Sequence, residues 1–369
     1  MRFLSFVFVV SCAYKSPPVP PPLVAHSESV VEPAKVRPTA MSAIATAGVT
    51  HPELQKVLSE HWEYQMQSYP TWATEIGDHR YDDQLAVGSE EVAQRHQAAV
   101  RRFLETASAI PEGALNPADR VTRAIFVEGR QSDVDQEVCR FRHWSVSPRN
   151  NQLGNANQLP ESHPRGSRDD AHNLLARYRM LPAVIDAETE QLSAGLKDGL
   201  VANARSLELV IEMLDRQLAE PVQEWPLYTV ALQTQVQWAS RDLWESDLRA
   251  VLGAEIKPAL ERYRKFLADD ALPTGRAGED ESLFGLELGD DCYEAMIRSH
   301  TTLPLEAADV HQTGLDELKK IHAEFAVLGK RVFGTGDLQE IYAHLRTDSA
   351  LYFETEEQVE QKGVDALAK

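Results

Sequence analysis

Cysteine is scarce in this chain, which contains only Cys12, Cys139 and Cys292 among its 369 residues. Because Cys12 lies in the N-terminal leader, the remainder of the chain can form at most one disulfide, and no metal cage can be built from cysteine alone. Cys139 and Cys292 are interpreted as small buried residues rather than as nucleophiles.

The chain also lacks any two histidines spaced four residues apart, although it contains twelve histidines. That spacing places two imidazoles on one helix face at zinc-binding distance. His311 and His322 share a face but lie about 16 Å apart on an α-helix, so one ion would need further ligands from other segments. No Gly-x-Ser-x-Gly, P-loop or complete Gly-x-Gly-x-x-Gly motif occurs. The sequence therefore assigns no catalytic residue and no metal ligand.

Basic residues are fewer than acidic residues in this chain. Lys and Arg number 37 against 57 Asp and Glu, which gives a formal net charge of −20 at pH 7. Nucleic acids and anionic membrane surfaces would be repelled, so neither is expected as the main partner. The charge sets no limit on a peptide substrate, and the oligomeric state is not indicated.

Long apolar runs are missing as well, because the run Phe3–Val10 is too short to span a bilayer. Preceded by Arg2, it predicts a signal peptide over residues 1–11. The sequence Val9-Val10-Ser11-Cys12 resembles a bacterial lipobox, which implies acylation of Cys12. The alternatives are a plain cleaved signal or a mis-assigned start codon. The favoured interpretation is a bacterial envelope lipoprotein, outer-membrane or periplasm-facing, that touches the membrane only through its lipid anchor.

Residues 12–50 are expected to act as a tether between this anchor and the folded body. Seven prolines fall between Pro17 and Pro38 and favour an extended chain rather than a packed core. The folded body is expected to begin near His51.

Apolar residues at helical spacing predict a large, nearly all-α array over residues 51–369. Pro182 is expected to kink or split its helix, and Pro258 to bend another. The helix from Asn116 has sparse apolar anchors, which favours a helix that packs against polar neighbours or lines a cleft. Residues 143–164 are expected to be irregular, and one short hairpin is allowed near residues 275–290. The predicted helices span residues 51–69, 89–110, 116 onward, 167–192, 203–218, 241–269, 306–332, 337–345 and 354–369.

Three segments resemble the DUF885 family of bacterial proteins. Tyr69-Pro-Thr-Trp-Ala-Thr-Glu-Ile-Gly-Asp-His-Arg-Tyr-Asp-Asp83 is similar to a segment near the start of that family's domain. Trp144 with the stretch 151–154 resembles a second. Gly289 to Ile321 carries the order Tyr…His-Thr-Thr…His-x-x-Gly-Leu and resembles a third. The resemblance covers about residues 51–369 and implies a helical scaffold.

Members of this family look like zinc metallopeptidases of the gluzincin type. In the family a His-Glu-x-x-His helix lies well beyond the third segment, and this chain does not contain it. The resemblance therefore implies zinc for the complete family protein, no cofactor for this chain alone, and a peptide as the suspected substrate. Residues 51–369 are expected to be a C-terminally truncated domain of this family.

The resemblance also marks candidate substrate-binding residues. His300, Thr301 and Thr302 could contact a peptide, or they could cap a helix end, and the structural role is favoured. His79 and Arg80 could line a site, or they could belong to an ion-pair cluster that fixes a turn, which is again favoured. The candidate binding residues are His79, Arg80, Tyr293, His300, Thr301, Thr302 and His311.

Three hypotheses for function follow. The first is the N-terminal portion of a zinc-dependent envelope peptidase, inactive alone. The second is a non-enzymatic helical envelope protein that binds peptides or a partner subunit. The third is a split enzyme whose zinc-binding half is a separate chain.

Overall fold

The computed structural model describes residues 40–233 and 236–368, and this part of the chain is all-α, as predicted. The predicted signal peptide, the predicted lipidation site Cys12 and most of the proline-rich tether lie outside the described residues. No helix in the described ranges is long and apolar enough to cross a membrane. The principal helices are α1 (Ala40–Ala45), α2 (Pro52–Ser68), α3 (Pro70–Glu75), α4 (Glu90–Ser108), α5 (Pro117–Asp135), α6 (Gln152–Ser162), α7 (Arg168–Lys197), α8 (Ala204–Ala219), α9 (Pro226–Thr229), α10 (Arg241–Val251), α11 (Lys257–Phe266), α12 (Gly289–Thr301), α13 (Ala307–Val332), α14 (Leu338–Thr347) and α15 (Glu356–Leu367).

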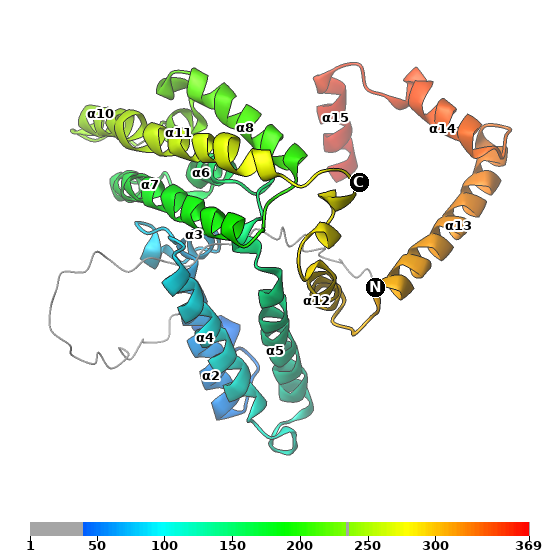
Figure 1. Ribbon diagram of the computed structural model, residues 1–369, viewed down its shortest axis with the longest axis horizontal. Helices are drawn as coiled ribbons and strands as arrows, with labels where there is room; N and C mark the ends of the chain where they lie inside the picture. The colour runs from blue at the N-terminus through cyan, green and yellow to red at the C-terminus, as the bar shows by residue number, and fades with distance from the viewer. Residues whose placement is uncertain (1–39, 234–235, 369) are drawn as a thin grey trace. The chain divides into compact units, whose positions relative to one another are not determined.

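The chain divides into two compact units, one ending at Thr302 and one beginning at Leu303. In the first unit the largest apolar core forms where α7 packs with α6, α10 and α11, and where α8 packs against α11 (Figure 1). The helix α8 supplies a stripe of fully or nearly fully buried residues, among them Leu207, Val210 and Leu214. Buried aromatic rings fill the space between the helices, with Tyr178, Trp225 and Tyr263 each at most 1% exposed. Most of the buried apolar side chains of the first unit belong to this core.

A second, smaller core in the same unit joins α2, α4 and α5. Phe103 and Leu54 are buried there, and Val49 packs with them although it precedes α2. The backbone amides of Thr50 and His51 both donate to the carboxylate of Asp119, at the start of α5. Packing therefore includes residues just before the expected start at His51.

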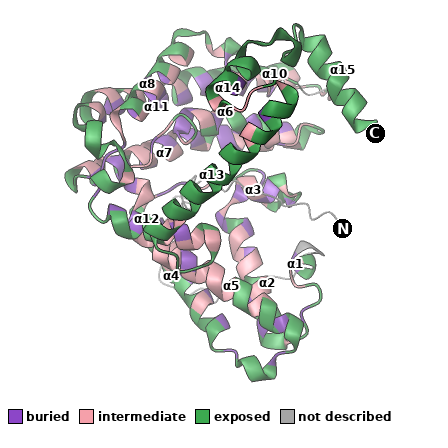
Figure 2. Cartoon of the chain, turned by 90° about the vertical axis from the view of Figure 1, so that its right-hand side faces the viewer, coloured by how far each residue is buried: buried purple, intermediate pink, exposed green. Residues whose placement is uncertain are grey.

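The second unit contains α13, α14 and α15 and buries little of its surface (Figure 2). Among its described residues only Gly329 and Ile341 are buried. They meet where α14 crosses α13: a β-carbon built at Gly329 would lie 2.2 Å from Cδ1 of Ile341. The absence of a side chain at Gly329 is thus what lets these two helices approach.

The helix is continuous at Pro182, whereas a π-helical turn precedes Pro258. The helix α7 runs through Pro182 as one element from Arg168 to Lys197, and the expected split does not occur. Tyr178 and Ile185 are fully buried on either side of the proline, so both halves of the helix pack into the core. Before Pro258, residues 252–256 form a π-helical turn. The wider turn accommodates the proline ring, which would clash with a carbonyl of a regular α-helix.

Two predictions about loops were wrong. Residues 143–164 were expected to be irregular, but they contain α6, which Asn151 caps by accepting a hydrogen bond from the Gly154 amide at 2.9 Å. The hairpin near 275–290 is absent from this described segment, which forms short 3-10 turns instead. The Arg276 guanidinium donates to the carbonyls of Asp280 and Glu281, both at 3.1 Å. These acceptors are therefore taken by a side chain and not by a partner strand.

Candidate functional site

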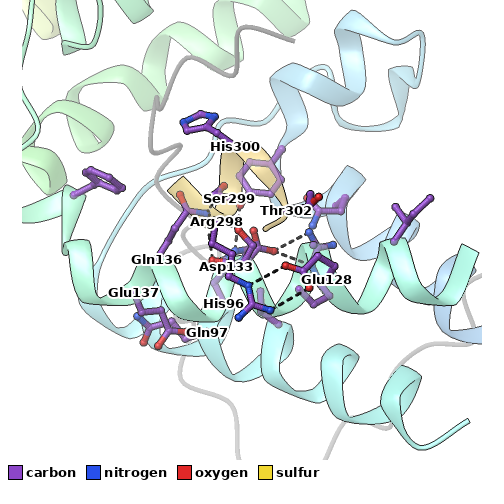
Figure 3. A pocket seen from close by; sticks show the side chains of 18 of the residues that line it. His96, Gln97, Glu128, Asp133, Gln136, Glu137, Arg298, Ser299, His300 and Thr302 are labelled. Carbon is purple, nitrogen blue, oxygen red and sulfur yellow. Dashed lines mark hydrogen bonds and ion pairs between the residues drawn. The ribbon is translucent and has the colours of Figure 1, made fainter. Parts of the chain in front are cut away.

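A cleft of about 870 Å³ opens in the first unit between α4, α5 and α12. Additional lining residues come from the end of α2 and from two short turns after α5, η3 (Gln136–Cys139) and η4 (Phe141–His143). Figure 3 shows Ser299 of α12 facing Gln136, and Glu137 beside Gln97 of α4. The polar lining residues include Gln65, Tyr69, His96, Gln97, Glu128, Arg130, Asp133, Gln136, Glu137, Arg140, Arg142, Arg298, Ser299, His300 and Thr302.

The helix α5 lines this cleft with both polar and apolar residues, which agrees with the prediction that it packs against polar neighbours or lines a cleft. Its Glu128 accepts two hydrogen bonds from Arg298 of α12, at 3.0 and 3.1 Å. This bidentate pair holds the pKa of the Glu128 carboxyl below its usual range. Arg298 also lies 3.5 Å from Asp135. The ionic contacts thus join two cleft walls that are far apart in the sequence.

Two histidines lie deeper, beside the junction of α2, α4 and α5. His96, a lining residue, contacts the hydroxyl of Tyr64 through Nδ1 at 2.9 Å and that of Tyr69 through Nε2 at 3.2 Å. His61 accepts a hydrogen bond at Nε2 from the Arg130 guanidinium and a second, at 3.0 Å, from Gln65. Because Arg130 can only donate, Nε2 of His61 must carry a lone pair.

Both histidines are held neutral. Burial, then the positive charge of Arg130, lowers the pKa of His61 to about 3 and that of His96 to about 4. For Asp133, burial raises the pKa of the carboxyl, while the neighbouring Arg130 opposes that shift. Arg130 donates from Nε to Oδ2 of Asp133 at 2.7 Å. His96 at the cleft and His61 behind it are therefore both neutral, and the ion pair of Arg130 and Asp133 lies at the cleft beside them.

These histidines do not fit a zinc ion. The lone pair on Nε2 of His61 points at a guanidinium, which would repel a cation, and both nitrogens of His96 are engaged by tyrosines. Across the described ranges, no three His, Cys, Asp or Glu side chains are placed to hold a metal.

The backbone is strained at the cleft. Among the described non-glycine residues, Arg140, Leu288 and Thr302 have positive φ angles, at 47°, 61° and 60°. Arg140 and Thr302 line the cleft, and Leu288 immediately precedes α12. Left-handed backbone costs about 1–3 kcal/mol at a non-glycine residue, and it concentrates at functional sites. The strain therefore supports the cleft as the candidate site.

One disulfide fixes this arrangement. Cys139 at the end of η3 and Cys292 in the first turn of α12 are bonded, and both are almost fully buried. The interpretation of both cysteines as buried residues is confirmed, and the single disulfide that the body allows is formed.

Of the candidate residues, His300 and Thr302 line the cleft, at the end of α12. Thr301 lies between them, and its hydroxyl donates to the Ile297 carbonyl of its own helix at 2.7 Å. Tyr293 is 37% exposed and packs edge-on against Phe284. His311 is exposed on α13 and belongs to the second unit.

His79 and Arg80 do not line this cleft. His79 pairs with Asp82 at 2.9 Å, and Arg80 pairs with Glu63 at 2.7 Å and with Asp78. This is the ion-pair cluster that the sequence favoured.

Beneath that cluster lies the fully buried Arg177 of α7. It donates to the carbonyls of Pro70, Tyr81 and Gln84 and to the hydroxyl of Thr74, at 2.6 to 3.1 Å. The turn that contains His79 and Arg80 is thus fastened to α7 by a buried guanidinium.

The sequence did not reveal His61, His96, Arg130 or Arg298. His61 and Gln65 are four residues apart on α2, and Arg130 and Asp133 are three apart on α5, so each pair shares a helix face. Such spacing recurs on many solvated helices, and only the packing of α2 against α4 and α5 shows that these faces meet.

These features define an all-α protein with a cleft between helices that is lined by apolar and charged side chains. The chain belongs to the DUF885 family, described as bacterial protein of unknown function, whose model matches residues 70–369. A solved structure described as "the putative lipoprotein from Colwellia psychrerythraea" is similar, with a TM-score of 0.70 at 15% identity. The match covers 85% of this chain and 58% of that one, so this chain spans less than two thirds of the neighbour's length. At this identity the likeness shows the fold alone. No curated protein matches the chain.

Proposed function

We propose that the cleft between α4, α5 and α12 binds a peptide, as the binding wall of a bacterial envelope protein. The observation that carries this proposal is the cleft itself, whose volume of about 870 Å³ lies within the range of ligand sites, roughly 300–1,000 Å³. A peptide backbone alternates donors and acceptors. The cleft lining carries both, with donors on Gln97, Gln136 and Arg298 and acceptors on Glu128 and Glu137. Arg298 and Glu128 are paired with each other, but a guanidinium has five N–H donors and a carboxylate about four acceptor sites, so both groups keep capacity for a ligand.

The finer proposal is that a complete DUF885 protein uses this wall in zinc-dependent hydrolysis of peptide bonds. The zinc ligands would then come from outside the described residues, because the cleft histidines do not fit a metal. When bound, zinc would activate the attacking water. The residues described here would bind and orient the peptide.

An envelope location is supported by the bacterial family, by the neighbour's description and by the buried disulfide, since disulfides persist in oxidising compartments. Lipidation of Cys12 is proposed from the sequence. Labelling cells with a fatty-acid analogue tests it, and equal labelling of a Cys12→Ala variant would refute it.

Peptide binding is tested by titrating a set of short peptides into the chain by calorimetry. Arg298→Ala removes a donor at the cleft wall and should weaken binding at least about tenfold, the effect of losing a charge-assisted hydrogen bond. The matched control is Arg262→Ala. Arg262 forms a comparable bidentate pair with Asp186, at 2.6 to 3.1 Å, but lies on α11 outside the cleft. Equal effects of the two variants, or no binding at millimolar peptide, would overturn the proposal.

Peptidase activity is tested separately. The chain is incubated with the same peptides, with and without added zinc. Binding without hydrolysis under both conditions would favour the non-enzymatic alternative.

The exposed apolar face of α13 favours a version of the non-enzymatic alternative in which the protein binds a partner, because large exposed apolar faces mark interaction surfaces.

A further inference from the structure

The helix α12 has few apolar contacts to hold it against the first unit. Of its 13 residues only Gly289, Cys292 and Ile297 are buried. Its aromatic residue, Tyr293, is 37% exposed and packs on Phe284, which is itself 59% exposed. Burial of one isoleucine side chain is a modest contribution for fixing a helix of this length.

The first turn of α12 is instead held covalently. Cys292 is bonded to Cys139, the last residue of η3, across 153 residues of sequence. Next to this anchor, Arg140 has its left-handed backbone and lines the cleft. The disulfide therefore connects the base of α12 directly to the segment that forms another part of the cleft wall.

The last turn of α12 makes polar contacts with the opposite wall of the cleft. Arg298 pairs with Glu128, and Ser299 accepts a hydrogen bond from Gln136 at 3.1 Å. These residues lie about 9–11 Å from Cys292 along the helix axis. Polar contacts at a half-exposed wall exchange readily with water, so they orient α12 without anchoring it.

We propose that Cys139 and Cys292 are positioning residues of the cleft: their disulfide fixes α12 as the cleft wall, and the wall is assembled only in the oxidised chain. The expected effect on peptide binding rests on the proposed function. The fixing of α12 by the disulfide does not depend on it. The bond forms by exchange with a disulfide oxidant. The two thiols lose two protons and two electrons, and the oxidant is reduced to a dithiol.

The experiment is amide hydrogen exchange, read by mass spectrometry, on the oxidised chain and on a Cys139→Ser/Cys292→Ser variant. Without the bond, amides of α12 should exchange at least about tenfold faster. The disulfide restrains local unfolding of this helix, and the variant lacks that restraint. Amides of α7 and α11, in the main core, should keep their rates.

Leu214→Ala is the control for general destabilisation, since Leu214 is fully buried in the main core and far from α12 in the sequence. It should accelerate exchange in the core without singling out α12. Unchanged α12 rates in the serine variant would overturn the proposal. Uniform acceleration of all helices would do the same, because the disulfide would then be a general staple.

Peptide titration of the same variant completes the test. Binding at least about tenfold weaker than in the oxidised chain, together with local loosening of α12, supports the positioning role. Faster α12 exchange in a protein whose oxidised form binds no peptide would support the positioning of α12 and refute the proposed function. Undiminished binding with a loosened α12 would refute the claim that this wall matters for the ligand.

Discussion

The two units of this chain use the same kind of amphipathic helix with opposite results. In the first unit, α8 carries an apolar stripe, and Leu207, Val210 and Leu214 on it are at most 1% exposed. In the second unit, α13 repeats its apolar residues just as regularly, yet Leu318 is 49% exposed and Val332 63% exposed. Periodicity therefore selects a helix and the face that is to be buried, but only a neighbouring element removes that face from water.

The units also differ in how polar groups are used. The first unit buries Arg177 and satisfies it with the carbonyls of Pro70, Tyr81 and Gln84. In the second unit, the ion pairs of Lys319 and Lys320 are exposed pairs within α13 itself. Exposed pairs of this kind contribute little to stability. The first unit is thus expected to be sensitive to single substitutions and the second to be tolerant.

The expected difference in sensitivity between the two units is tested most directly at Arg177. An Arg177→Ala substitution leaves several buried acceptors without a donor and opens a cavity, so it should destabilise the first unit by about 3–5 kcal/mol. All six tryptophans lie between Trp62 and Trp244, so tryptophan fluorescence during urea unfolding reports the first unit alone. A loss below about 1 kcal/mol would show that the buried network contributes little.

Leu214 and Leu318 allow the same substitution to be compared at a buried and at a half-exposed position. Leu214→Ala in the main core should cost about 2–5 kcal/mol, through lost burial and a residual cavity. Leu318→Ala on α13 should cost less than about 1 kcal/mol, because half of that side chain already contacts water. Urea unfolding followed by fluorescence and by circular dichroism separates the two effects. Similar losses would mean that the stripe of α13 is covered in solution.

Acid should also act on the first unit selectively. The pKa values of His61 and His96 are about 3 and 4 in the folded chain, below the ordinary value of 6.5. The unfolded chain therefore binds protons first, and stability is lost as pH falls below 6.5 toward these folded values. Between pH 7 and pH 5 each histidine should cost about 2 kcal/mol.

Variants isolate this contribution. Burial raises the pKa of Glu188 to about 7, which works in the opposite direction over the same range. The prediction therefore concerns the difference between the parent chain and a His61→Gln/His96→Gln variant, in which Glu188 is unchanged. Fluorescence-monitored unfolding free energies at pH 7 and pH 5 should show a smaller loss in the variant. Parallel pH dependence in both proteins would contradict the assignment.

Much of the fold could be predicted from local sequence. The helices α2, α4, α8, α13 and α14 appear close to their predicted ranges, because their caps and apolar spacing act within a few turns. The element α6 was missed because Gly154 and Pro160 mask its short stripe of Leu153, Ala156 and Leu159. The segment 275–290 could not be predicted, since its conformation depends on the guanidinium of Arg276.

The candidate site was predicted only at its rim. His300 and Thr302 were found because they belong to a recognisable stretch, and α5 because its polarity was unusual. The deeper residues, His61, His96 and Arg130, come from three helices separated by loops of different length. Nothing in their local spacing indicates that they meet.

The sequence by itself determined the helical class, the negative charge, the family and the absence of a paired-histidine zinc motif. These follow from composition and from patterns a few residues long. The tertiary structure decided that Cys139 and Cys292 pair and that α5 faces α12 across a cleft. It also decided that Arg177 donates to the backbone around the turn that contains His79 and Arg80. Contacts between residues about 100 or more positions apart carry these features, and their geometry depends on how whole helices pack.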